Sequence, residues 1–205
     1  MATIYDLKPR FQALLRPLSD ALVRSRLSAN DVTLGALLLS AAHGAWLALM
    51  PDSAWPLLLL PVTLFVRMAM NAIDGMMAKE HGQAGPAGAV LNELSDVIAD
   101  AALYLSFALI DGLNAVLVVL VVVAGIVAEM AGSLGPLIKA QRNYAGPLGK
   151  SDRAFAFGLL AVLLGLGLTP GLWTTLYLAA LLVLSGLTIV NRARRIVADA
   201  KGRAV

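Results

Sequence analysis

The residues that decide the fold are 113–138, LNAVLVVLVVVAGIVAEMAGSLGPLI, which carry one charged side chain, that of Glu129. A helix that crosses a bilayer needs about 20 predominantly apolar residues. This stretch is long and apolar enough, so it predicts a membrane-spanning helix. Five similar segments flank it, at about 32–50, 55–78, 88–110, 154–169 and 172–190. The sequence therefore predicts an all-α integral membrane protein with six transmembrane helices.

The composition agrees with this class. Of the 205 residues, 59% are hydrophobic and 14% are charged, whereas soluble domains have about 45–50% apolar and about 25% charged residues. The absence of cysteine excludes disulfides, iron–sulfur clusters and thiolate zinc sites. On a membrane protein, a net charge of +3 is accounted for by basic residues in the cytoplasmic loops. We therefore expect no nucleic-acid partner.

Residues 3–26 predict an amphipathic helix that precedes the spans. Apolar residues recur there at spacings of three and four, with basic residues between them: Ile4, Leu7, Phe11, Leu14, Leu18 and Leu22. A helix of this kind lies in the membrane interface and does not cross the bilayer. The alternative is a solvated N-terminal tail. We expect a single domain over 1–205, with the interfacial helix in 1–30, the six-helix bundle in 31–192 and a basic cytoplasmic tail in 193–205.

The basic residues predict the orientation. With six spans, every Lys and Arg except Arg67 falls on one side of the membrane, and the loops at 51–54, 111–112 and 170–171 have none. Because Lys and Arg are concentrated in cytoplasmic loops, both termini are expected in the cytoplasm. We therefore expect a multi-pass protein of the inner (plasma) membrane, with its lipid bilayer as a partner.

Polar residues inside the second and third spans predict the functional site. They belong to the stretch 71–100, NAIDGMMAKEHGQAGPAGAVLNELSDVIAD. At about 100° per residue, Arg67, Asn71 and Asp74 share one stripe of the second helix. The third helix gathers further polar side chains within roughly a 100° arc: Asn92, Glu93, Asp96 and Asp100.

Three carboxylates on one face repel one another unless a cation binds there, and oxygen ligands suit hard divalent cations. The short Gly-rich loop between the two spans makes the helices antiparallel neighbours. The sequence thus predicts a site for metal and diphosphate near the cytoplasmic leaflet.

The spacing of these residues resembles the signature of the CDP-alcohol phosphotransferases, D-x2-D-G-x2-A-R-x8-G-x3-D-x3-D. On this chain every spacing fits, at Asn71, Asp74, Gly75, Ala78, Lys79, Gly88, Asn92 and Asp96. Five positions are identical, one is Lys for Arg, and two are Asn for Asp. The segment LSANDVTLGALL at 27–38 also resembles the family's Pro-Asn-x-x-Thr start of the first span, with Asn30 and Thr33 in place but no proline.

The resemblance implies transfer of a phosphatidyl group from CDP-diacylglycerol to a small polar alcohol, with release of CMP, in phospholipid biosynthesis. In the family, four aspartates hold two divalent metals, Mg²⁺ or Mn²⁺, and the last one is also the general base. By resemblance Asp96 is the base, and the metal positions are Asn71, Asp74, Asn92 and Asp96. The implied CDP-binding residues are Asn30, Thr33, Gly75, Ala78, Lys79 and Gly88. A homodimer is a further expectation of the family.

The departures from the signature leave alternatives open. Each Asn for Asp removes a negative charge, for which Glu93 or Asp100 could compensate. Arg67 either takes the place of a missing cation's charge or pairs with Glu129. Small residues of the fourth span suit either a dimer face or packing within the chain: Gly125, Ala128, Gly132 and Gly135.

The segment QRNYAGPLGKSDRA at 141–154 carries the predicted acceptor-binding residues Arg142, Lys150 and Arg153. In the family this region helps to bind the phosphate of a phosphorylated acceptor. Glycerol 3-phosphate is the first candidate acceptor, and phosphatidylglycerol and an inositol phosphate are the alternatives. Anchoring by the positive-inside rule explains the same charges without a ligand. Two other functions compete with the transferase: a homologue that binds nucleotide or lipid with weakened catalysis, and a small membrane transporter that uses the intramembrane carboxylates.

Overall fold

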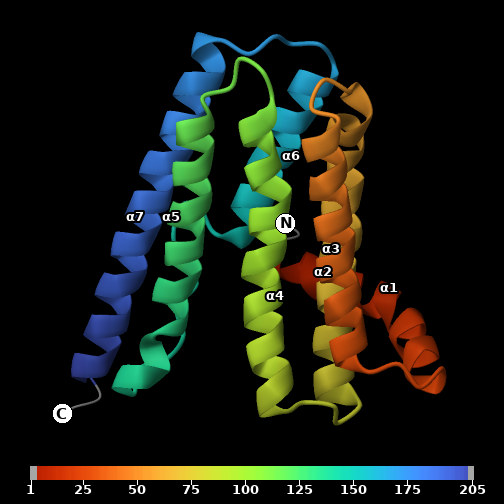
Figure 1. Ribbon diagram of the computed structural model, residues 1–205. Helices are drawn as coiled ribbons and strands as arrows, with labels where there is room; N and C mark the ends of the chain where they lie inside the picture. Colours follow the sequence, from red (N-terminus) through yellow and green to blue (C-terminus); the bar gives the residue numbers. More distant parts are fainter. Residues whose placement is uncertain (1–3, 203–205) are drawn as a thin grey trace. The chain divides into compact units, whose positions relative to one another are not determined.

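The computed structural model describes residues 4–202, with side chains described from Phe11 onward, and contains only helices in this range (Figure 1). The elements are α1 (Ile4–Arg24), α2 (Ala29–Leu49), α3 (Ala54–Glu80), α4 (Pro86–Leu105), η1 (Ser106–Leu109), α5 (Ala115–Ser133), η2 (Gly135–Ile138), α6 (Lys150–Gly165) and α7 (Leu172–Gly202). The predicted all-α class is confirmed.

Four helical segments are long and apolar enough to cross a membrane: Ala29–Leu49, Ala54–Glu80, Ala115–Ile138 and Leu172–Gly202. The other two predicted spans fall on α4 and α6, which are shorter or more polar. Helix α4 carries the carboxylates of Glu93, Asp96 and Asp100, and α6 has 16 residues. The count of six spans therefore stays a prediction.

The described chain divides into two compact units. The first unit comprises the chain up to His43 together with Val62–Ala99, and the second comprises Gly44–Pro61 and the chain from Asp100 onward. Helices α2, α3 and α4 each contribute to both units, and the expected single domain over 1–205 stays a prediction.

In the first unit, α2 and α3 pack as antiparallel neighbours. A hydrogen bond joins Thr33 to Asp74 near one end, and another joins His43 to Thr63 near the other. Helix α4 follows α3 after a loop in which Gly82 has a φ of +67°. Such a backbone conformation favours glycine, and Pro86 suits the first turn of α4 because its missing N–H is not needed there. This loop explains why α3 and α4 return beside each other.

Helix α1 packs on the same unit. Leu15 and Leu22 pack against a core cluster that includes Ile73 and Met77, whereas Leu14 is 76% exposed. The exposed Arg16 donates hydrogen bonds of 2.9 and 3.1 Å to Glu80, and this contact raises the pKa of Arg16 above its ordinary value.

The location of α1 in the membrane interface stays a prediction. The exposed Leu14 is consistent with it, because an interfacial helix presents apolar side chains to the lipid. The first two members of the predicted apolar stripe, Ile4 and Leu7, have side chains outside the described residues.

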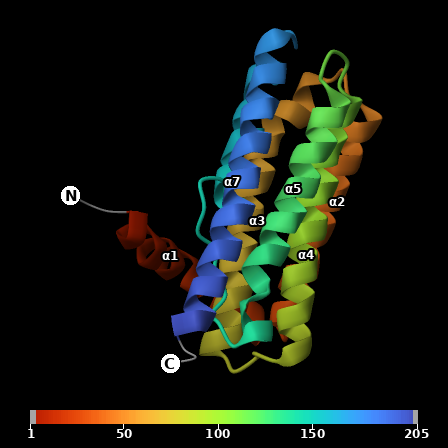
Figure 2. The ribbon, with the colours of Figure 1, turned by 90° about the vertical axis from the view of Figure 1, so that its left-hand side faces the viewer.

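In the second unit, α5 and α7 lie side by side, as both views show (Figures 1 and 2). Asn114 caps α5 by accepting a hydrogen bond of 3.1 Å from the Leu117 N–H, as expected of a residue that precedes a helix. Phe157 of α6 stacks on Tyr104 with 4.2 Å between ring centroids. Helix α7 continues through most of the stretch expected as a basic tail and is described to Gly202; residues 203–205 lie outside the described residues.

Gly44 permits a close approach of two helices in the second unit. A Cβ atom at this position would overlap the carbonyl oxygen of Ala102. We expect Gly44→Ala to lower the free energy of unfolding by about 1–3 kcal/mol, the usual cost of overpacking. Chemical unfolding of the purified protein in detergent measures this, with Gly186→Ala as the control because a Cβ at that position would have no neighbouring atom within 4 Å. Equal stability of the two variants would contradict the prediction.

Candidate functional site

The four predicted metal positions come together between α3 and α4. The amide nitrogen Nδ2 of Asn71 donates a hydrogen bond of 3.0 Å to Oδ1 of Asp96. The Nδ2 of Asn92 donates one of 3.3 Å to Oδ2 of Asp74. Each asparagine therefore faces an aspartate of the other helix. The 3.6-residue period produces this result, because positions 71 and 74 share one stripe and positions 92 and 96 share another.

Asp74 is the more deeply buried of the two aspartates, with 3% exposure. Its Oδ2 also accepts a hydrogen bond of 2.8 Å from the hydroxyl of Thr33 on α2. Next to it, Gly75 has no neighbouring atom within 4 Å of the position that a Cβ would take. A buried carboxylate thus lies beside a position where a ligand can approach the helix backbone.

Arg67 lies beside Asp96. Its Nη2 donates a hydrogen bond of 3.0 Å to the backbone carbonyl of Asp96 and lies 3.6 Å from Oδ1 of the same residue. The Arg67 side chain is 4% exposed, while that of Asp96 is 26% exposed. This contact supports the first of the two interpretations of Arg67. A pairing with Glu129 would join the two units and stays a prediction.

The residues expected to bind the nucleotide lie toward the start of α2, the end of α3 and the start of α4. Oδ1 of Asn30 lies 2.9 Å from the position of a Cβ at Gly88, so these two residues are in contact. Ala78 packs against the core of the first unit, and Lys79 is exposed at the end of α3. The loop that follows is tied to α2, because the Ala29 N–H donates a hydrogen bond of 2.6 Å to Oε1 of Gln83.

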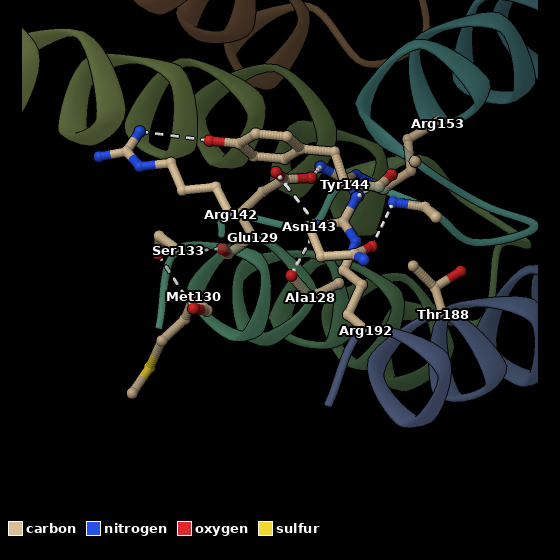
Figure 3. A network of polar contacts seen from close by, with 12 residues as sticks. Ala128, Glu129, Met130, Ser133, Arg142, Asn143, Tyr144, Arg153, Thr188 and Arg192 are labelled. Carbon is tan, nitrogen blue, oxygen red and sulfur yellow. Dashed lines mark hydrogen bonds and ion pairs between the residues drawn. The ribbon is translucent and has the colours of Figure 1, made fainter. Parts of the chain in front are cut away.

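A second polar cluster is centred on Glu129 of α5, in the second unit (Figure 3). Arg153 of α6 donates a hydrogen bond of 2.8 Å from Nη2 to Oε1 of Glu129, and the same nitrogen lies 3.2 Å from Oδ2 of Asp100. Nη1 of Arg192 on α7 lies 3.3 Å from Oε2 of Glu129. Two buried guanidinium groups are therefore balanced by two carboxylates, as burial of charge requires.

The predicted acceptor residues divide between the surface and this cluster. Arg142 is exposed and donates a hydrogen bond of 3.2 Å to the hydroxyl of Tyr144, as Figure 3 shows. Lys150 begins α6 and is half-buried. Only Arg153 is buried, and its charge is compensated by Asp100 and Glu129.

Comparison with known families identifies the chain. The family model for CDP-alcohol phosphatidyltransferase matches residues 26–190. The chain belongs to this family. The inner membrane protein YnbA of Escherichia coli (strain K12) is 44% identical over 196 residues, which are 95% of this chain and 96% of that protein. With this relative and the apolar helices, the chain is a multi-pass membrane protein.

Solved structures share the fold of this chain. The phosphatidylinositol phosphate synthase PgsA1 of Mycobacterium tuberculosis with CDP-DAG bound has a TM-score of 0.74 and 20% identity, over 88% of this chain and 92% of that chain. The same enzyme in complex with manganese and citrate gives a TM-score of 0.74 and 20% identity, over 88% and 87%. At this identity the likeness shows the fold.

The oxygen atoms of the four side chains at the predicted metal positions are of the kind that suits a hard divalent cation. Among residues 11–202, no three His, Cys, Asp or Glu side chains gather as a metal site. Asp74 and Asp96 have carboxylate oxygens, and the amide oxygens of Asn71 and Asn92 are further potential ligands. Asp100 contacts Arg153, and compensation by Glu93 or Asp100 stays a prediction.

Glycines of α5 make room for the buried arginines. A Cβ at Gly125 would lie 3.1 Å from Nε of Arg153, and one at Gly132 would lie 3.2 Å from Nη1 of Arg192. Packing within the chain thus accounts for these two small residues. The homodimer stays a prediction.

Two residues of these clusters were missed from the sequence. Gln83 carries no distinguishing pattern in its loop. The distribution of basic residues places Arg192 with the other arginines that follow the sixth span, but its side chain is 1% exposed. Its register could have revealed it, because Thr188, Arg192 and Ile196 are buried at four-residue intervals along α7, whereas Arg194 and Arg195 are exposed.

Proposed function

We propose that this protein transfers a phosphatidyl group from CDP-diacylglycerol to a small polar alcohol and releases CMP, in phospholipid biosynthesis. The observation that carries the proposal is the pair of hydrogen-bonded contacts that gather Asp74 and Asp96 with Asn71 and Asn92. Membership of the CDP-alcohol phosphatidyltransferase family supports the reaction class. The relative of like fold that holds CDP-DAG supports the donor.

Asp96 is the proposed general base. Its carboxylate takes the proton from the acceptor hydroxyl while that oxygen attacks the phosphorus that bears the diacylglycerol. The bond from this phosphorus to the bridging oxygen breaks, and CMP leaves with the electron pair. Asn71 and Arg67 contact the carboxylate and the backbone of Asp96, so the base is held in one orientation, which general-base catalysis requires.

A divalent cation, Mg²⁺ or Mn²⁺, would be held by Asp74 and Asp96 with amide oxygens of Asn71 and Asn92. When bound, it would neutralise the diphosphate and polarise the phosphorus. Thr33 contributes indirectly, because its hydroxyl fixes the carboxylate of Asp74.

The proposed nucleotide-binding residues are those of the signature and of the start of α2: Asn30, Thr33, Gly75, Ala78, Lys79 and Gly88. Lys79 keeps the positive charge of the family's arginine but loses its bidentate fork. The exposed position of Lys79 at the end of α3 suits a contact with a phosphate or ribose from the cytoplasmic side.

Gly75→Ala tests the approach of the nucleotide to α3. Because a Cβ at this position would have no neighbouring atom within 4 Å, we expect stability to be kept or raised by about 0.5–1 kcal/mol, the usual gain of Ala over Gly in a helix. The KM for CDP-diacylglycerol should rise by about tenfold or more, since one lost contact costs on the order of 1.4 kcal/mol. An unchanged KM in the folded variant would remove Gly75 from the binding site.

The charge balance around Arg153 bears on the acceptor. A phosphorylated alcohol such as glycerol 3-phosphate needs uncompensated positive charge, but Arg153 already pairs with Asp100 and Glu129. Arg142 in the loop and Lys150 at the start of α6 are the other basic residues proposed to supply such charge. The compensation of the Arg153 charge favours an uncharged alcohol as the acceptor. Comparing the rates of CMP release with glycerol and with glycerol 3-phosphate distinguishes the two kinds of acceptor.

In the membrane, we propose six spans, with α4 and α6 crossing beside the four longer helices and α1 in the interface. Both termini and the active site would then face the cytoplasm, at the inner (plasma) membrane. The distribution of Lys and Arg supports this orientation.

Release of CMP from CDP-diacylglycerol by the purified protein tests the proposed function. The assay supplies Mg²⁺ or Mn²⁺ and a panel of alcohols that includes glycerol and glycerol 3-phosphate. We expect CMP with at least one alcohol and its loss on addition of EDTA. Folded protein that binds CDP-diacylglycerol but releases no CMP would favour the second candidate, a binding homologue. The observation that motivates this candidate is the presence of asparagine at two of the four signature aspartate positions, 71 and 92.

A further inference from the structure

The centre between α3 and α4 contains a positive charge of its own. The guanidinium of Arg67 lies 3.6 Å from a carboxylate oxygen of Asp96, and the same side chain donates to the Asp96 backbone carbonyl at 3.0 Å. Its side chain is 4% exposed. A guanidinium stays protonated under all ordinary conditions, so this charge is permanent.

The negative charge available to metal ions is correspondingly small. Asn71 and Asn92 stand at two of the four signature positions, which leaves the carboxylates of Asp74 and Asp96. Two divalent cations are neutralised by four carboxylates, but at the four signature positions here they would meet two carboxylates, with one guanidinium beside them. A second cation on Asp96 would also face Arg67 across a partly buried site, where repulsion is stronger than in water.

The two aspartates have different hydrogen-bond partners. Oδ2 of Asp74 accepts hydrogen bonds from the neutral groups of Thr33 and Asn92. Oδ1 of Asp96 accepts from Asn71 and faces Arg67. The guanidinium beside Asp96 therefore raises the free energy of a second cation at that carboxylate.

We propose that this centre takes one divalent cation, held mainly by Asp74, and that the guanidinium of Arg67 supplies the second positive charge beside Asp96. The inference rests on the proposed function for its substrate, but the number of cations does not depend on turnover. Arg67 is then a positioning residue: it orients Asp96 and offsets part of the negative charge of the diphosphate.

Manganese counting tests the proposal. The purified full-length protein in lipid nanodiscs is titrated with Mn²⁺ in the presence of CDP, and bound Mn²⁺ is counted by electron paramagnetic resonance. We expect one Mn²⁺ per chain with the spectrum of an isolated ion, and loss of that ion in Asp74→Asn. Two ions per wild-type chain, or none, would overturn the proposal.

A gain-of-charge variant provides the complementary measurement. Asn71→Asp with Asn92→Asp restores the four-carboxylate set, and we expect it to bind a second Mn²⁺ that couples magnetically to the first. Retained elution volume and melting temperature show that the variant is folded. A folded double variant that still binds one ion would overturn the charge argument.

Arg67 itself is tested in both backgrounds. In the otherwise wild-type chain, Arg67→Met should lower kcat by about 100-fold while the count of one Mn²⁺ is kept, and Arg67→Lys should recover at least a tenth of the activity. In the Asn71→Asp, Asn92→Asp background the loss should shrink to less than about tenfold. Equal losses in both backgrounds would overturn the role of Arg67. One bound Mn²⁺ without any CMP release would instead contradict the proposed function alone.

Discussion

Asp96→Asn is expected to lower the rate of CMP release by a factor of about 10³ or more, because general-base catalysis alone contributes about 10²–10⁴. The substitution removes the proton acceptor and one negative charge at the proposed cation site. Asparagine has nearly the same shape as aspartate, and its amide oxygen can accept the 3.0 Å hydrogen bond from Asn71 that Asp96 accepts in the wild type. We therefore expect the variant to fold. Steady-state release of CMP from CDP-diacylglycerol measures the effect.

Asp52→Asn is the matched control for this experiment. It makes the same chemical change at an exposed carboxylate in the turn between α2 and α3, and its turnover should equal that of the wild type. Wild-type turnover in folded Asp96→Asn would remove Asp96 as the base.

Glu129→Ala is expected to have the largest effect on stability. It removes the carboxylate that contacts both Arg153, at 2.8 Å, and Arg192, at 3.3 Å. Asp100 still compensates Arg153, but Arg192 loses its nearest described carboxylate while its side chain is 1% exposed. Removal of one partner of a buried ion pair costs about 3–5 kcal/mol. We expect a loss of this size in the free energy of unfolding in detergent.

An exposed ion pair provides the control for Glu129. Arg16 and Glu80 are joined at 2.9 Å, with side chains 52% and 42% exposed. Solvent and salt screen such a pair, so Glu80→Ala should change the unfolding transition much less than Glu129→Ala. Similar shifts for the two variants would show that burial of the Glu129 cluster does not determine its contribution.

The site between α3 and α4 could be predicted because it depends on local rules. Helical periodicity places Asn71 with Asp74 and Asn92 with Asp96, and a short Gly-rich loop returns α4 beside α3. The contact between Thr33 and Asp74 was not predicted. The family resemblance implies that Thr33 binds CDP and that Asp74 binds metal, but it does not imply a hydrogen bond between them.

The cluster around Glu129 was not predicted, for a physical reason. Its members come from α4, α5, α6 and α7, and no periodicity within one helix shows which side chains of different helices meet. Basic residues near the end of a span also follow the positive-inside rule, which hides a buried Arg192 among solvated arginines. The orientation of the Asn71 and Asn92 amides likewise depends on three-dimensional neighbours.

The central claim, transfer of a phosphatidyl group, is tested most directly by following the phosphorus. CDP-diacylglycerol labelled with ³²P at the phosphate next to the diacylglycerol is incubated with the protein, Mn²⁺ and glycerol or glycerol 3-phosphate, and the lipids are separated. The account predicts a new phospholipid that contains the label and the alcohol, with unlabelled CMP as the second product. Label that stays in CDP-diacylglycerol, or appears only in phosphatidic acid, with folded protein would contradict it.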